Sequence, residues 1–260
     1  MKRISQLKDE ALEALHGNFG KAVLATLGVI AISIAINFVF SALSGTNILD
    51  YYSALLKNDF NALMSASGGS VLVSILQILV ALFFTSPLGV GVANAYRALY
   101  ESKGSDNTLF KNFFKLAFGK KYGHIILVNI VSGLLITLMI VPVYVVLSLF
   151  IFLLHNPVVT IIMALLSLVF IIWIGLMYSQ IKYIILDNPE LDIIDTMRRS
   201  RHLMDGNKWR YILMILSFLG WILLGILTLC IGYLWLIPYI NTTEGAFYCD
   251  IRDAEKVAAE

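Results

Sequence analysis

Four long stretches of the chain contain no Asp, Glu, Lys or Arg, and this feature constrains the fold more than any other. They cover residues 22–49, 61–96, 122–181 and 211–243. A helix crosses the hydrocarbon core of a bilayer in about 20 residues, so each stretch is long enough for at least one crossing. Hydrophobic residues make up 59% of the chain, more than a water-soluble domain of this size can bury. The sequence therefore predicts an all-α, polytopic transmembrane helical bundle.

The longest uncharged stretch, 122–181, has room for two crossings and contains a turn signal near its middle. His155-Asn156-Pro157 interrupts the apolar sequence there. Proline is tolerated in the first turn of a helix but cannot continue the preceding one. We therefore expect two helices that are joined by a turn at these three residues.

The last uncharged stretch decides the number of spans. One helix over 211–240 would be about 45 Å long, whereas the hydrocarbon core is roughly 30 Å thick. Gly225 and Gly232 lie near its middle, and glycine readily adopts turn conformations. We expect two helices joined there, the second continuing past Pro238 toward Tyr248, and about six spans in all. A single, strongly tilted helix is the alternative, with five spans.

The basic residues are distributed unevenly between the two sides of this six-span arrangement. The segments 1–21, 96–123 and 182–210 and the tail after 241 hold four, six, six and two of the 19 lysines and arginines, and only Lys57 lies on the other side. Basic residues concentrate in cytoplasmic segments beside spans, so both termini are expected in the cytoplasm. Residues 1–21 are polar and precede a long apolar run, unlike a cleaved signal peptide.

A short pattern recurs at 15–21, 117–124 and 204–210. Each copy has a glycine, then polar, aromatic and basic residues, and then an apolar run. An amphipathic stretch precedes each copy. We expect each stretch to form an interfacial helix on the cytoplasmic leaflet with its apolar face toward the lipid, ended by the glycine in a left-handed conformation. The single membrane domain then divides into three units of one surface helix and two spans, 1–103, 104–186 and 187–260.

The apolar residues of the amphipathic stretches recur at helical spacing. They are Ile4, Leu7, Ala11 and Leu15 in the first, Leu109, Phe110, Phe113, Phe114, Ala117 and Phe118 in the second, and Leu191, Ile194, Met197 and Leu203 or Met204 in the third. The third helix is expected to start at Asp187-Asn188-Pro189-Glu190, which combines a capping residue with an early proline. After each turn, one side chain is expected to anchor the next span at the headgroup level. These anchors are Lys21, Tyr122 and Trp209.

Several segments together carry a family resemblance. They are Asp187-Asn188-Pro189-Glu190-Leu191, Ser200-Arg201-His202-Leu203-Met204-Asp205-Gly206-Asn207-Lys208-Trp209-Arg210 and Phe218-Leu219-Gly220-Trp221, with a softer match at Gly17-Asn18-Phe19-Gly20-Lys21 and Phe247-Tyr248. The chain resembles the bacterial membrane-protein family called domain of unknown function 975, which implies an integral protein of the bacterial plasma (inner) membrane and lends no catalytic residues. It is more distantly similar to the membrane domain of some glycerophosphodiester phosphodiesterases, and we expect no counterpart of their soluble catalytic domain in the segments outside the spans.

The interiors of the expected spans lack ionisable side chains, which argues against proton-coupled transport and against intramembrane hydrolysis. The sequence also lacks a nucleophile elbow, a phosphate loop, a dinucleotide fingerprint and metal-ligand spacing. We therefore expect no catalytic residues, metal or cofactor. Neutral polar residues do lie at depth, and one hypothesis is that they line a polar cavity in the bundle. The candidates are Asn37, Gln77, Asn94, Asn129 and Gln180. Interhelical hydrogen bonds, worth about 0.6 kcal/mol each, are the simpler explanation.

The densest basic cluster is Arg198-Arg199-Ser200-Arg201. Topology and anchoring to the leaflet explain it, and binding of anionic lipid headgroups, at about 1 kcal/mol per basic residue, is the alternative. The candidate lipid contacts are Arg198, Arg199, Arg201, Lys208 and Arg210. Such clusters are ordinary beside spans, so no nucleic-acid partner is expected. Cys230 and Cys249 are expected to be buried and unbridged, because one helix would separate them by about 28 Å.

Three classes of function remain. The first, which we favour, is a non-enzymatic component that binds membrane lipids or a membrane-protein partner, including a second copy of itself, through its surface helices. The second is a transporter or channel for a neutral or amphiphilic solute, since internal repeats are common in transporters. The third is a lipid-modifying enzyme that uses interfacial residues such as Asp187, Asp192, Asp195 or His202. The acidic residues are equally well explained as charges that favour a helix N-terminus.

The expected topology has a direct test. A reporter enzyme that is active only outside the cell, fused after Glu260, should be silent because the six-span arrangement leaves the C-terminus in the cytoplasm. Activity of that fusion would support the five-span alternative.

Overall fold

The structure, a computed structural model, describes residues 1–44, 53, 56–57, 71–105, 109–154, 156–229 and 231–259, and its regular elements in these ranges are all helical. The elements, in chain order, are α1 (Ile4–Leu15), α2 (Phe19–Ser44), α5 (Val71–Val80), the π-helix η1 (Ala81–Thr85), α6 (Ser86–Glu101), α7 (Leu109–Phe118), α8 (Tyr122–Leu154), α9 (Pro157–Tyr178), α10 (Ile181–Asp187), α11 (Ile193–Met204), α12 (Lys208–Leu216), α13 (Leu219–Leu227) and α14 (Tyr233–Ala259).

Five helical stretches in the described part of the chain are long and apolar enough to cross a membrane. They are Phe19–Phe40, Leu72–Glu101, Tyr122–Phe150, Val158–Asp187 and Lys208–Leu227. The second joins α5, η1 and α6, the fourth joins α9 and α10, and the fifth joins α12 and α13. The chain is therefore a helical, membrane-embedded protein, as its uncharged stretches predict.

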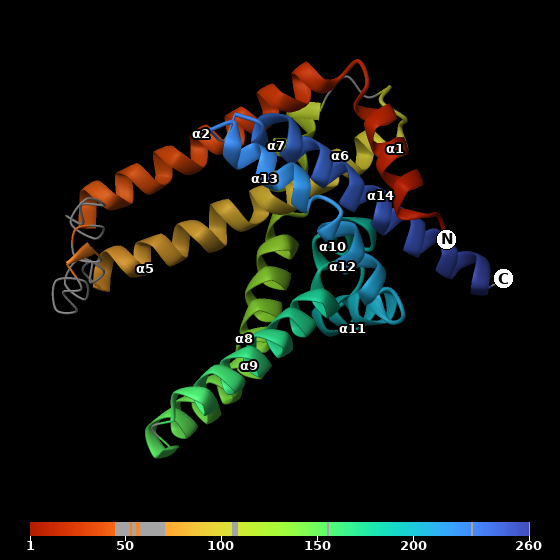
Figure 1. The fold of residues 1–260 in the computed structure, drawn as a ribbon. Coiled ribbons are helices and arrows are strands. Elements are labelled where there is room, and N and C mark those ends of the chain that lie inside the picture. The colour runs from red at the N-terminus through yellow and green to blue at the C-terminus, as the bar shows by residue number, and fades with distance from the viewer. Residues whose placement is uncertain are drawn as a thin grey trace.

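Two long helical arms extend from a common base (Figure 1). One arm contains α2 and α5, and the other contains α8 and α9, which lie side by side. The 33 residues of α8 make it about 50 Å long. The predicted turn between α8 and α9 is confirmed at Asn156, whose side chain accepts hydrogen bonds from the backbone N–H groups of Val158 (2.9 Å) and Val159 (3.5 Å). Pro157 then begins α9, and His155 lies outside the described residues.

The predicted break in the last apolar stretch is also confirmed. The helix α13 ends at Leu227, and α14 begins at Tyr233 and continues past Pro238. Leu229 in the intervening turn has a φ of 51°, a conformation that is uncommon for a residue with a side chain. Cys230 lies outside the described residues.

Three-residue turns follow the amphipathic helices α1, α7 and α11. Gly17 and Gly206 have φ values of 79° and 73°, so the predicted left-handed conformation is confirmed at these two positions. It is wrong at Gly119, which is outside the left-handed region. Gly119 is needed for space instead, since a Cβ there would collide with the carbonyl oxygen of Lys115.

The third amphipathic helix begins later than the sequence predicts. Asp187 ends α10, and α11 starts at Ile193 after Asp192. The expected start at 187–190 is wrong because the preceding helix continues through Asp187, which pairs with arginines as described below. Ile194, expected on the apolar side of this helix, is 53% exposed and therefore points away from the protein core.

The apolar sides of the amphipathic helices are covered by protein. Leu7, Ala11 and Leu15 of α1 are fully buried, and α1 packs against α14 and α6. On α7, Phe113 and Ala117 are fully buried against α6 and α2. On α11, Met197, Leu203 and Met204 are buried in the same way. These faces therefore contribute to the protein core, and the expectation that they lie toward the lipid is wrong for these residues.

The helix α6 is the centre of this core because two helices cross it closely. A Cβ built at Gly91 would lie 2.5 Å from the carbonyl oxygen of Phe113 and 2.8 Å from the Cβ of Ala117, both on α7. A Cβ at Gly245 of α14 would lie 2.9 Å from the Cα of Arg97 on α6. Small residues allow such close backbone approaches between membrane helices.

Substitution of Gly245 tests the close crossing. Gly245→Ala should lower the stability by about 1–3 kcal/mol, the usual cost of overpacking, because the added methyl group meets the backbone of α6. Thermal unfolding in detergent micelles, followed by circular dichroism, measures this change. Gly133→Ala in α8 is the matched control, since a Cβ there meets nothing within 4 Å. Equal unfolding temperatures for the two variants would contradict the proposed crossing.

Candidate functional site

The ends of α6, α10 and α14 meet at the base of the two arms, and each of them carries charged residues there. Long spans exclude charges from their interiors, so charged side chains begin where the spans end. The helix α6 contributes Arg97 and Glu101, α10 contributes Asp187 with Lys182, and α14 contributes Arg252 among others. Their side chains form a polar network that joins helices far apart in the sequence.

Asp187 is the centre of the network. Its carboxylate lies 3.1 Å from Nη1 of Arg97 and 3.5 Å from Nη1 of Arg252, and it accepts a hydrogen bond of 2.8 Å from the hydroxyl of Tyr248. Both guanidinium groups also lie beside the ring of Tyr248, at 5.6 and 5.7 Å from its centroid. Tyr248 stacks on Tyr183 of α10 at 5.0 Å. Charge and aromatic contacts therefore hold three helices at one point.

Glu101 extends the network toward the surface. It accepts from Nη1 of Arg252 at 3.0 Å and from Sγ of Cys249 at 3.4 Å. Burial, together with the negative charge of Glu101, raises the pKa of the Cys249 thiol to about 12. This cysteine is free and buried, as expected. A thiol that stays protonated is a poor nucleophile, so Cys249 acts here as a hydrogen-bond donor.

A second, partly buried pair connects α10 with α14. Nζ of Lys182 lies 2.5 Å from Oε2 of Glu244, and the hydroxyl of Tyr211 donates to Oε1 of Glu244 at 3.1 Å. The side chain of Asn94 on α6 donates to the carbonyl oxygen of Lys182 at 2.6 Å. Lys182 and Glu244 therefore neutralise each other in a partly buried position, where an unpaired charge would be costly.

The N-terminal segment is fixed to the same region. The backbone N–H of Lys2 donates to Asp250 at 3.0 Å, and Arg210 contacts both Asp250 (2.6 Å) and the carbonyl oxygen of Lys2. Nζ of Lys2 and the hydroxyl of Tyr100 both donate to Glu10, at 2.7 and 2.6 Å. Burial opposes ionisation of Glu10, but these two hydrogen bonds outweigh it and lower the pKa of this carboxyl group overall.

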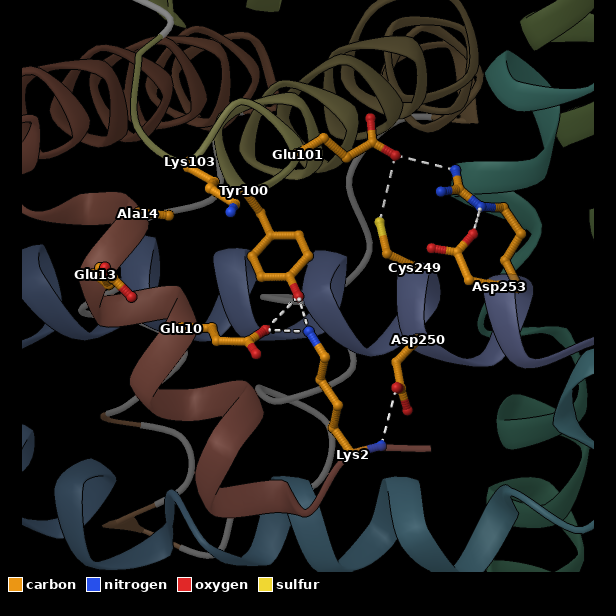
Figure 2. Close-up of a pocket in the computed structure, with 11 residues that line it drawn as sticks. Lys2, Glu10, Glu13, Ala14, Tyr100, Glu101, Lys103, Cys249, Asp250 and Asp253 are labelled. Carbon is orange, nitrogen blue, oxygen red and sulfur yellow. Dashed lines mark hydrogen bonds and ion pairs between the residues drawn. The ribbon is translucent and has the colours of Figure 1, made fainter. Parts of the chain in front are cut away.

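A polar cavity of about 490 Å³ opens between the N-terminal segment, the end of α6 and α14 (Figure 2). Charges of both signs line it, and most of them are paired with one another across its walls, as the dashed lines in Figure 2 show. The lining residues are Lys2, Glu10, Glu13, Ala14, Tyr100, Glu101, Lys103, Cys249, Asp250, Arg252 and Asp253. The internal pairing makes this cavity part of the structural network.

An apolar groove of about 410 Å³ lies between the corner of α1 with α2 and the hairpin of α13 with α14. Its lining residues are Leu12, Phe19, Trp221, Leu224, Gly225, Thr228, Gly232, Trp235, Leu236 and Tyr239. Trp221 and Trp235 are 55% and 51% exposed. The hydroxyl of Thr228 donates to the carbonyl oxygen of Gly225 and accepts from the N–H of Gly232, both at 3.0 Å. The groove therefore presents mainly aliphatic and aromatic surface.

The five candidates for a central polar cavity occupy different environments. Asn94 and Gln180 are buried, at 1% exposure, and Asn129 is half-buried. Asn37 and Gln77 are exposed on α2 and α5. Buried atoms without a hydrogen-bond partner in the described part of the chain include Oδ1 of Asn94, Nδ2 of Asn129 and Oε1 of Gln180. The two cavities described above are lined by other residues, and the polar central cavity stays a prediction.

The basic residues proposed to contact anionic lipid are largely paired within the protein. Arg198 pairs with Asp195 (2.7 Å), Arg199 with Glu255 (2.6 Å), Lys208 with Asp205 (3.3 Å) and Arg210 with Asp250 (2.6 Å). Arg201 is exposed and has no ion pair with any residue that the structure describes. Internal carboxylates thus already neutralise four of these five charges.

The three proposed interface anchors also differ from one another. Trp209 is 66% exposed, whereas the hydroxyl of Tyr122 donates to the carbonyl oxygen of Phe83 at 2.5 Å. Lys21 is exposed, and its Nζ donates to Oδ1 of Asn18 at 3.4 Å. Of the two aromatic anchors, Trp209 is therefore exposed at the protein surface, whereas the hydroxyl of Tyr122 is bonded to the protein backbone.

Sequence reasoning missed the network and the groove. The sequence pattern predicts Asp187 as a helix cap or an interfacial enzyme residue, and it explains the basic residues at the span ends by topology, anchoring or lipid binding. A usable signal was present for the groove, since Trp221 and Trp235 flank the pair Gly225 and Gly232. Which helices would pack against this hairpin was not visible in the sequence.

Comparison with known proteins gives one match. The model of the family described as "Protein of unknown function (DUF975)" matches residues 1–255, which confirms the resemblance noted from the sequence. No curated protein and no solved structure matches the chain. The more distant similarity to a phosphodiesterase membrane domain therefore stays a prediction.

Removal of the central charge tests the network. Asp187→Asn should lower the stability by about 1–3 kcal/mol, because a buried charge-assisted contact is lost while its partners remain. The measurement is the unfolding temperature in detergent micelles. Asp195→Asn is the matched control, since its pair with Arg198 is exposed and such pairs contribute about 0–1 kcal/mol. The same small effect for both variants would show that the network does not stabilise the fold.

Proposed function

The chain belongs to the DUF975 family of proteins of unknown function, and we propose that this member is a non-enzymatic membrane component that binds lipid. In this proposal it lies in the bacterial plasma membrane with six spans and both termini in the cytoplasm. Its amphipathic helices α1, α7 and α11 lie at the cytoplasmic surface of the membrane. An acyl chain occupies the groove between α1, α2, α13 and α14.

The apolar groove is the observation that supports this proposal. Its walls include residues of two helical stretches that are able to cross a membrane, Phe19–Phe40 and Lys208–Leu227. In a bilayer, acyl chains surround such stretches and have direct access to the groove. Its volume of about 410 Å³ falls within the usual range for ligand sites, about 300–1,000 Å³.

Exposed apolar residues support the interfacial position of the amphipathic helices. Leu12 on α1, Ile194 on α11 and Trp209 at the start of α12 are 39%, 53% and 66% exposed. They point away from the protein core, although their neighbours on the same helices are buried in it. Aliphatic and aromatic groups of this kind favour the boundary between headgroups and acyl chains.

The partly buried pair of Lys182 and Glu244 makes a crossing by α14, as the sixth span, compatible with the charge that this helix carries. The helix is uncharged from Tyr233 to Thr243, which is about 16 Å and only half of the hydrocarbon core. A complete crossing must therefore carry Glu244 close to the lipid. The ammonium group of Lys182 at 2.5 Å neutralises that carboxylate and reduces the cost of its position.

Retention of lipid tests the proposal. Native mass spectrometry of the protein released from its own membrane in mild detergent should detect a stoichiometric phospholipid. Leu224→Trp should reduce its retention about tenfold, equivalent to about 1.4 kcal/mol, because the indole fills the groove from an exposed position.

Leu227→Trp is the matched control for this substitution. Leu227 is on the same helix and is 78% exposed, but it does not line the groove, so lipid should remain bound. A wild-type protein without lipid, or equal retention by both variants, would overturn the proposal.

A further inference from the structure

A lysine lies beside the apolar groove. Lys8 precedes Leu12 by one helical turn on α1, and residues four apart lie on the same face of a helix. Leu12 lines the groove. Nζ of Lys8 is 5.8 Å from the ring centroid of Tyr239, which also lines the groove. The groove therefore has a positive charge adjacent to its lining.

The position of the Lys8 ammonium group is well defined. It donates to the hydroxyl and the carbonyl oxygen of Ser217, at 3.2 and 3.3 Å, and lies 4.3 Å from the ring centroid of Phe218. Phe218 is buried and packs edge-on against Tyr239 at 5.0 Å. Phe218 and Tyr239 thus help to hold the Lys8 side chain between the end of α12 and the groove.

Lys8 has no salt bridge within the part of the chain that the structure describes. No carboxylate lies within ion-pair distance of its Nζ among the residues that the structure describes. Burial lowers the pKa of Lys8, although the nearby charge of Asp9 opposes this effect. An additional anionic group at Nζ would stabilise the charged form and offset the cost of its partial burial.

We propose that the groove selects a phospholipid with a net anionic headgroup, which contacts Lys8 while one acyl chain extends past Leu12 into the groove. This inference rests on the proposed lipid binding and specifies the class of lipid. The groove and the charge are complementary to the two ends of such a molecule. A peptide fits less well, because its backbone N–H and C=O groups need hydrogen-bond partners that an aliphatic and aromatic lining does not supply.

The experiment uses full-length protein in nanodiscs made from equal amounts of phosphatidylglycerol and phosphatidylcholine. After release, native mass spectrometry gives the ratio of the two lipids that stay bound. Wild type should prefer phosphatidylglycerol about fivefold, the factor that corresponds to about 1 kcal/mol for one basic residue. Lys8→Gln should retain lipid but lose the preference, and Lys8→Arg should keep it.

Lys115→Gln is the matched control, because Lys115 is exposed on the amphipathic helix α7 and lies away from the groove lining. Its preference should equal that of wild type; a loss as large as that of Lys8→Gln would indicate general surface attraction and overturn the inference. Should Lys8→Gln fail to fold, the wild-type preference at rising salt gives the answer, since screening weakens the attraction of a partly buried charge, although less than that of an exposed one. A preference that is absent or insensitive to salt contradicts the role of Lys8.

The outcomes separate this inference from the proposed function. Retained lipid without a headgroup preference, or an unchanged preference in Lys8→Gln, overturns the anionic selection and leaves lipid binding in place. Absence of any retained lipid in wild type overturns both.

Discussion

The ion pair between Arg97 and Asp187 is the contact on which the rest of the structure depends. Spans in lipid keep their charges at their ends, and such ends can pack together only when the charges neutralise one another. Asp187 also binds Tyr248 and pairs with Arg252, so one carboxylate joins α6, α10 and α14. The close approach of α14 to α6 at Gly245 brings the helices near enough for these contacts.

The helix α1 packs beside this network, and two of its sides line two different cavities. Lys2 and Glu10 bind Asp250 and Tyr100, so one side of α1 lines the polar cavity. Leu12, on another side of the same helix, lines the apolar groove. The N-terminal helix therefore connects the charged base of the protein with the apolar groove. This proximity supports lipid binding as the function, with Lys8 beside the groove.

Local signals in the sequence predicted the local structure well. The turn at Asn156-Pro157, the break between Gly225 and Gly232 and the left-handed conformation of Gly17 and Gly206 all follow from properties of a few adjacent residues. The predicted helix start at Asp187 was wrong because the side chain is engaged by arginines from distant segments. The candidate site was poorly predictable for the same reason. Its groups come from both ends of the chain and from its middle, and no local pattern states which helices pack together.

The sequence by itself determined that this protein is a bundle of apolar helices in a membrane. Uncharged stretches of about 20 residues or more favour helices in lipid, because a helix satisfies the backbone hydrogen bonds within a single segment. Only the tertiary structure decided which charges pair, that the amphipathic helices bury their apolar sides in protein, and that an apolar groove forms beside Lys8. These features depend on contacts between segments far apart in the chain, where packing geometry rather than local composition sets the energy.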